Sequence, residues 1–143
     1  RVILRSNENT RGAFWRLLGD TELELVAVRD GTPYTSFRDR YWGDLGYIHI
    51  CFDINGMASL ADRCKQANFS FTVDSRDSFD MGKAAGHFSY CEDPDGTLIE
   101  FVETHKIPII EKIGWYLNIR NRNPDKPLPD WMLNMLSLNR VRD

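Results

Sequence analysis

Residues 86–102 decide the fold, and they read GHFSYCEDPDGTLIEFV. Apolar and polar residues alternate on both sides of a central Asp-Pro-Asp-Gly, which is a sequence typical of a tight turn. The pattern therefore predicts a hairpin of two strands, His87–Glu92 and Leu98–Glu103. Alternation elsewhere in the chain predicts further strands at Val2–Arg5, Gly12–Leu18, Glu22–Val28, Tyr47–Asp53 and Phe69–Asp74.

One predicted helix interrupts these strands. Apolar residues from Met57 to Cys64 recur at the spacing i, i+3, i+4, i+7, behind Asn55 as N-cap and ahead of Asn68 as a left-handed stop. From Tyr47 onward the predicted order is strand, helix, strand, strand, strand, which is a complete βαβββ module.

An incomplete copy of this module precedes it. Residues 12–26 repeat the pattern of residues 86–102 with a turn shorter by two residues, so that Thr21 aligns with Thr97 and Glu24 with Glu100. We therefore predict an α+β fold in which paired βαβββ modules form an open, curled mixed sheet. Module one is expected to be incomplete at its N-terminus, because Arg1 reads as the middle of a strand.

The repeat suggests three domain segments. Residues 1–44 are expected to hold the last strands of module one plus a linker, and residues 45–104 the complete second module. Residues 105–143 form a mildly basic C-terminal extension, with 7 basic and 4 acidic side chains, which we expect to pack on the barrel or on a partner subunit.

Composition excludes several classes of protein. The chain has 143 residues and a net charge of -3, which disfavours nucleic acid as a partner. Its longest apolar runs are far below the roughly 20 residues that a membrane span needs. Its three cysteines show no CxxC spacing, which favours a reducing compartment. We therefore expect a cytoplasmic protein that binds neither nucleic acid nor membrane.

Two segments carry a family resemblance. Gly46-Tyr47-Ile48-His49-Ile50 opens the second module, and residues 90–100, YCEDPDGTLIE, close it. In these segments the chain resembles the vicinal oxygen chelate superfamily, which contains glyoxalase I, bleomycin-resistance proteins and extradiol dioxygenases. The resemblance covers residues 1–104, and the tail from His105 has no counterpart in the family core.

The resemblance implies a metal site. In the family, ligands lie on the first and last strands of each module, which here places them at His49, Glu100 and, through the repeat, Glu24. One imidazole and two carboxylates suit a divalent ion such as Zn, Ni, Co, Fe or Mn. The alternatives are a core histidine at 49, a surface carboxylate at 100, and Glu22 in place of Glu24 as the inward side chain.

The resemblance also implies a function. We expect a glyoxalase-like metal-dependent enzyme, an isomerase or lyase that acts on a small oxygen-bearing substrate through a metal-stabilised enediolate, with Glu100 as the catalytic acid–base and a homodimer as the assembly. An extradiol-type dioxygenase is the first alternative, although a glutamate at position 24 argues mildly against it. The second is a metal-free binding protein of the resistance type. The aromatic loop Arg38–Asp44 covers the rim or contacts substrate.

Overall fold

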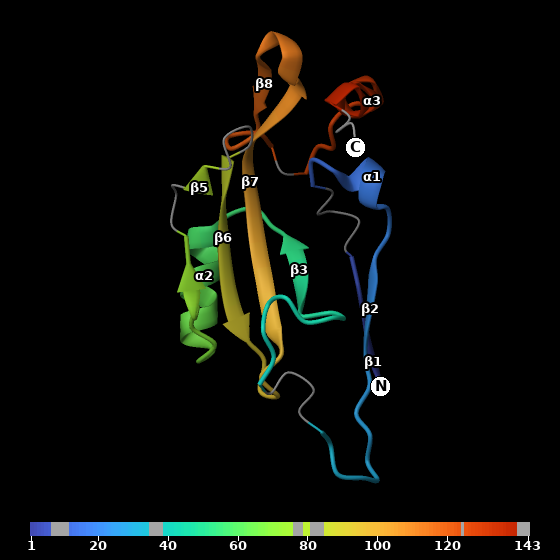
Figure 1. The fold of residues 1–143 in the computed structure, drawn as a ribbon, viewed down its shortest axis with the longest axis vertical. Helices are drawn as coiled ribbons and strands as arrows, with labels where there is room; N and C mark the ends of the chain where they lie inside the picture. Colours follow the sequence, from blue (N-terminus) through green and yellow to red (C-terminus); the bar gives the residue numbers. More distant parts are fainter. Residues whose placement is uncertain (7–11, 35–38, 76–78, 81–84, 124, 140–143) are drawn as a thin grey trace. The chain divides into compact units, whose positions relative to one another are not determined.

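The chain folds into two units, which are drawn in Figure 1. Unit 1 comprises residues 1–31 and 105–143, and unit 2 comprises residues 32–104. The secondary structure is α+β with open sheets, so the predicted fold class is confirmed. The computed structural model describes residues 1–6, 12–34, 39–75, 79–80, 85–123 and 125–139.

Unit 2 contains a mixed sheet whose strands follow the order β3-β7-β6-β4, with β5 paired to β6. β3 runs parallel to β7, and both β4 and β5 run antiparallel to β6. Strand, helix and three strands follow one another as the sequence predicts, with the short β5 as an addition. The elements are β3 (His49–Asp53), α2 (Met57–Gln66), β4 (Val73–Asp74), β5 (Phe79–Asp80), β6 (Ala85–Glu92) and β7 (Leu98–Ile110), of which residues 105–110 belong to unit 1.

The hairpin between β6 and β7 is shaped by Asp93. Its Oδ1 atom accepts hydrogen bonds from the backbone N–H groups of Asp95, at 2.9 Å, and Thr97, at 2.8 Å. Gly96 has φ +82°, a conformation that favours glycine. The Asp93 N–H also donates to the Thr97 carbonyl at 3.0 Å, so the hairpin is centred on Asp95.

Helix α2 begins differently from the prediction. The expected N-cap at Asn55 is wrong, because the residue before Met57 is Gly56, with φ 87° and no side chain. The Glu103 side chain of β7 takes over the capping role, since its Oε1 accepts the Gly56 N–H at 2.6 Å. The predicted left-handed stop at Asn68 is confirmed, with φ 62°.

Close approach of β6 and β7 requires glycine at position 86. A Cβ atom at Gly86 would lie 2.7 Å from the backbone oxygen of Glu103, which is closer than side-chain carbons come to carbonyls. The two central strands of unit 2 can therefore lie side by side only because this residue has no side chain.

Unit 1 departs from the predicted module. β1 (Val2–Arg5) and β2 (Glu22–Leu25) pair antiparallel with Ile3 opposite Glu24. The strand expected over Gly12–Leu18 is wrong, because this segment forms a turn and the short helix α1 (Trp15–Leu18). The reason lies in a tertiary contact. The Leu128 N–H donates to the Ala13 carbonyl at 2.8 Å, so this carbonyl is bonded to the tail and is not available to an adjacent strand.

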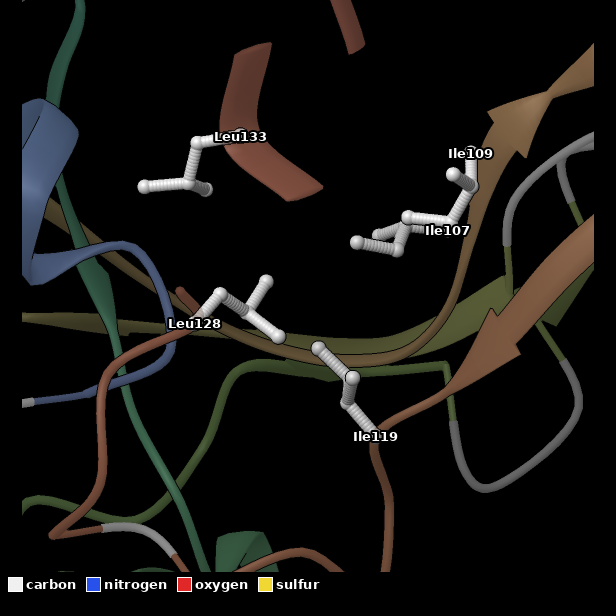
Figure 2. Packing of buried hydrophobic residues seen from close by; sticks show 5 residues of the cluster. All are labelled: Ile107, Ile109, Ile119, Leu128 and Leu133. Atoms are coloured by element: carbon white, nitrogen blue, oxygen red, sulfur yellow. The ribbon is translucent and has the colours of Figure 1, made fainter. Parts of the chain in front are cut away.

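The tail builds the apolar core of unit 1. Ile107 and Ile109 of β7, Ile119, Leu128 and Leu133 are buried and gather around a common centre in Figure 2, and Ala13 and Phe14 pack against them. No helix in the described parts of the chain has the length and apolarity to cross a membrane. The tail elements are η2 (Glu111–Ile113), β8 (Trp115–Asn118), which pairs with β7, α3 (Asp130–Leu136) and η3 (Ser137–Asn139).

Candidate functional site

His49 and Glu100 meet on one face of the sheet of unit 2. Cys51 of β3 lies opposite Glu100 of β7 in the parallel register. Because side chains alternate along a strand, His49, Cys51 and Glu100 share a face. The His49 Nε2 atom lies 2.9 Å from Glu100 Oε2, and the two side chains are 27% and 16% exposed. The structure thus brings together two of the three predicted ligands.

Tyr90 binds the other oxygen of Glu100. Its hydroxyl donates to Glu100 Oε1 at 2.5 Å, and the Cys51 thiol also donates a hydrogen bond to the carboxylate. Tyr90 was not among the site residues predicted from the sequence. The signal was available, because residues 90 and 100 are equidistant from Asp95 and a hairpin centred there places them opposite each other.

An aromatic ring closes one side of this group. The Trp42 ring lies 5.7 Å from the ring centres of both His49 and Tyr90. The loop that carries Trp42 is fixed by Arg40, whose guanidinium donates to the Leu45 and Tyr47 carbonyls. Trp42 is 64% exposed, so it forms the solvent side of the cluster. Trp42, from the loop expected either to cover the rim or to contact substrate, therefore lies beside His49 and Tyr90, whereas Arg38 falls outside the described residues.

Two neutral donors surround the carboxylate. Partial burial, followed by the hydrogen bond to Glu100, raises the pKa of the Cys51 thiol to about 12. The same two causes raise the pKa of Tyr90 well above its ordinary value. At neutral pH both groups therefore stay protonated and donate hydrogen bonds to Glu100. Cys51 does not act as a nucleophile, and Tyr90 is not an anion.

His49 and Glu100 have the chemistry of two metal ligands, since an imidazole nitrogen and a carboxylate oxygen both bind Zn²⁺ and similar ions. Their Nε2 and Oε2 atoms lie 2.9 Å apart, which is the distance of a direct hydrogen bond between the two side chains. The His49 Nδ1 atom is buried and has no hydrogen-bond partner among the described residues. Within the described residues, no group of three or more His, Cys, Asp or Glu side chains is arranged to hold a metal ion.

The third predicted ligand, Glu24, lies on β2 in unit 1. Its carboxylate pairs with Arg1 at 2.6 Å, just as Glu22 pairs with Arg5 at 2.6 Å. The equivalence of Glu24 with Glu100 came from the repeat, and the helical segment at α1 breaks that repeat. Its role as a ligand stays a prediction.

The other two histidines have partners of their own. His87 Nε2 lies 2.5 Å from Asp74 Oδ1. His105 is buried in unit 1, where its carbonyl accepts the Ile119 N–H at 2.8 Å.

Comparison with known proteins supplies the family. The sequence profile described as Glyoxalase/Bleomycin resistance protein/Dioxygenase superfamily matches residues 2–101. No curated protein and no solved structure matches the chain. The profile spans both segments on which the resemblance rested, so that resemblance is confirmed. The chain therefore belongs to the Glyoxalase/Bleomycin resistance protein/Dioxygenase superfamily.

Proposed function

We propose that the protein is a metal-dependent enzyme of isomerase or lyase type that moves a proton on a small substrate with adjacent oxygens. The observation that supports this proposal is the contact between His49 Nε2 and Glu100 Oε2, 2.9 Å apart on neighbouring strands. His49 and Glu100 would hold the ion, with Glu24 as a further predicted ligand. When bound, a divalent ion polarises a substrate oxygen and stabilises the charge that develops there.

Three side chains have separate roles in the proposed proton transfer. Glu100 would accept the proton on one of its carboxylate oxygens and return it to a neighbouring substrate atom, which is general acid–base chemistry. Tyr90 holds the other oxygen of Glu100 in place. Trp42 covers the solvent side of His49 and limits the access of water.

Metal uptake tests the first half of the proposal. Untagged protein is dialysed against Zn, Ni, Co, Fe or Mn and its metal content is measured. The wild type is expected to retain about one ion per chain, and His49→Ala and Glu100→Gln are expected to lose at least about tenfold in affinity, because each removes a direct ligand. Glu92→Gln, at an exposed position on the same β6–β7 hairpin, is the matched control. Equal metal content in all four proteins would refute the metal site.

Proton transfer tests the second half. The metal-loaded protein is incubated in D2O with small α-hydroxycarbonyl compounds, and deuterium at the carbon is followed by NMR. Exchange that is present in the wild type and absent in Glu100→Gln, at a metal concentration that saturates both proteins, supports the assigned base. Exchange at the wild-type rate in Glu100→Gln would remove Glu100 from that role.

A metal-free binding protein is the second candidate. It is favoured by the fact that both oxygens of Glu100 already have partners within the chain, one in His49 and one in Tyr90. This candidate predicts no metal uptake by the wild type, so the dialysis experiment separates the two. The substrate, the homodimer and the cytoplasmic location stay predictions.

A further inference from the structure

Helix α2 packs on the sheet of unit 2 through one face, which includes a cysteine. This face consists of Met57, Leu60, Ala61 and Cys64, which recur at i, i+3, i+4 and i+7. Met57 is buried and the other three are half-buried, whereas the remaining residues of the helix are exposed. The Cys64 side chain therefore lies on the inner face of α2.

Cys91 of β6 points to the side of the sheet where this helix lies. The Tyr90 hydroxyl binds Glu100 on the site face, so the next residue along the strand, Cys91, points to the opposite face. Glu103 points to that opposite face too, since it lies three residues from Glu100, and its Oε1 accepts an N–H group at the start of α2 at 2.6 Å. Cys91 is 4% exposed, so the protein covers it.

The two thiols are neighbours. Burial, followed by the charge of the Cys64 thiolate, raises the pKa of the Cys91 thiol, and a charge has this effect only at close range. The connection between helix and sheet is short as well. The Cys64 carbonyl accepts the Phe69 N–H at 2.8 Å, and three residues later the Thr72 N–H donates to the Tyr90 carbonyl at 2.8 Å.

Small side chains let the helix approach the strand closely at this point. A disulfide needs its two Cα atoms within about 7 Å of each other, which bulky residues between a helix and a sheet would prevent. Ala61 lies one turn before Cys64 on the inner face of α2. Ser89, two residues before Cys91 on the same face of β6, is buried.

We propose that Cys64 and Cys91 form a reversible disulfide when a peroxide oxidises the Cys64 thiol. Cys64 is half-buried and Cys91 is buried, so hydrogen peroxide reaches Cys64 first. The Cys64 sulfur gives two electrons to the O–O bond, becomes a sulfenic acid and releases one water. The Cys91 sulfur then bonds to the Cys64 sulfur, and the sulfenic hydroxyl leaves with the Cys91 proton as a second water. This site is separate from the proposed metal site and does not depend on it.

The matched control is Cys51, the exposed cysteine. Its thiol donates a hydrogen bond to Glu100 and stays protonated at neutral pH, which slows its reaction with peroxide. Exposure alone would therefore select Cys51, whereas the proposed pair selects Cys64.

The test maps disulfides after oxidation. Reduced wild type, Cys51→Ser and Cys91→Ser are treated with hydrogen peroxide at neutral pH, free thiols are blocked, and unreduced peptides are analysed by mass spectrometry. Wild type and Cys51→Ser are expected to lose about 2 Da, the mass of two hydrogens, and to yield a Cys64–Cys91 link that dithiothreitol cleaves. Cys91→Ser should instead accumulate a sulfenic acid at Cys64, which dimedone traps. Cys91→Ala serves if Cys91→Ser does not fold.

The unfolded chain in concentrated urea is the reference. Loop closure there favours Cys51 with Cys64, which are 13 residues apart, over Cys64 with Cys91, which are 27 apart. The folded protein is expected to reverse this order and to form Cys64–Cys91 in at least about tenfold excess, because the fold places these two thiols together. Equal proportions in folded and unfolded protein, a Cys51–Cys64 link in the folded protein, or sulfinic acid at Cys64 of the wild type without a link would overturn the inference. An unchanged mass after peroxide treatment would overturn it as well.

Discussion

Glu100 shows how one side chain can be tolerated in an apolar strand. It stands between Ile99 and Phe101, and a half-buried carboxylate there is costly unless its oxygens have partners. Tyr90, Cys51 and His49 provide those partners. The charge is thus retained on the sheet face where the proposed chemistry needs it.

The Cys51 thiol should be unreactive although the residue is solvent-accessible. Its pKa is raised from 9.0 to about 12, so the protonated form persists through neutral and mildly alkaline pH. In metal-free protein at pH 8, Cys51 should react with iodoacetamide roughly a thousandfold more slowly than an unperturbed thiol, since only the thiolate attacks. Its rate should still be rising about tenfold per pH unit at pH 10. Peptide mass spectrometry resolves Cys51 from the other two cysteines, and rapid labelling at pH 8 would contradict the assignment.

Glu24 and Glu22 offer a matched pair of substitutions. Both lie on β2 and each pairs with an arginine at 2.6 Å. If the repeat alignment holds, Glu24→Gln weakens metal binding at least about tenfold and Glu22→Gln leaves it nearly unchanged. Calorimetric titration of both variants measures this. The opposite result would mean that the alignment of the first module is displaced by two residues.

At the scale of elements, sequence patterns correctly predicted those helices and strands whose formation depends on residues close to each other in the sequence. β1 lies at Val2–Arg5 as expected, and the helix at Met57–Gln66 lies where its apolar spacing places it. The strand predicted over residues 12–18 was wrong because Ala13 and Phe14 pack against the tail. A pattern of residues close together in the sequence carries no sign of this contact. β8 was missed for the same reason, since it depends on pairing with the end of β7.

The same contrast holds for the site. His49 and Glu100 were found because a histidine and a carboxylate stand out in apolar strands. Tyr90 was missed because a tyrosine in a strand is ordinary, and only the hairpin register places its hydroxyl on Glu100.

The close approach of β6 and β7 at Gly86 predicts that a larger residue there destabilises the protein. A methyl group at this position would lie 2.7 Å from the Glu103 carbonyl oxygen, and both groups belong to backbone that cannot yield cheaply. Gly86→Ala should lower the free energy of unfolding by about 1–3 kcal/mol, which is the usual cost of overpacking. Gly43→Ala, which would meet no atom within 4 Å, is the control and should change stability by less than about 0.5 kcal/mol. Urea denaturation measures both, and equal midpoints for the two variants would contradict the close approach.

Asp53, at the end of β3, should make the stability of the protein depend on pH. Burial, and then the charge of Glu103, raise the pKa of Asp53 from 3.8 to about 6. Because the folded state holds this proton more tightly than the unfolded state, the stabilising contribution is present below pH 4 and is lost as pH rises through 6. Asp53→Asn should therefore be more stable than the wild type at pH 7, by less than about 1 kcal/mol because the residue is partly exposed, and this advantage should disappear at pH 4. Urea denaturation at both pH values checks the sign, and a larger advantage at pH 4 would reverse it.

At the scale of the whole molecule, the main buried apolar cluster and the polar cluster around Glu100 belong to different units. Unit 2 is a sheet with a polar cluster on one face, around Glu100. Unit 1 has an apolar core built largely by the tail, with Ile109 and Leu128 almost completely buried. The superfamily match covers residues 2–101, so the whole of this tail lies beyond it. The tail thus adds buried apolar residues to unit 1, while His49 and Glu100 belong to unit 2.

The central claim is that His49 and Glu100 hold a divalent ion. The chain has three histidines, which makes nitrogen-15 NMR of the imidazoles a direct measurement. On addition of Zn²⁺, the Nε2 resonance of His49 is expected to shift at one equivalent, while those of His87 and His105 stay in place because both lie outside the proposed site. The shift should be lost in Glu100→Gln at the same Zn²⁺ concentration. A shift at His87 or His105 with His49 unchanged, or no shift at any of the three, would contradict the account.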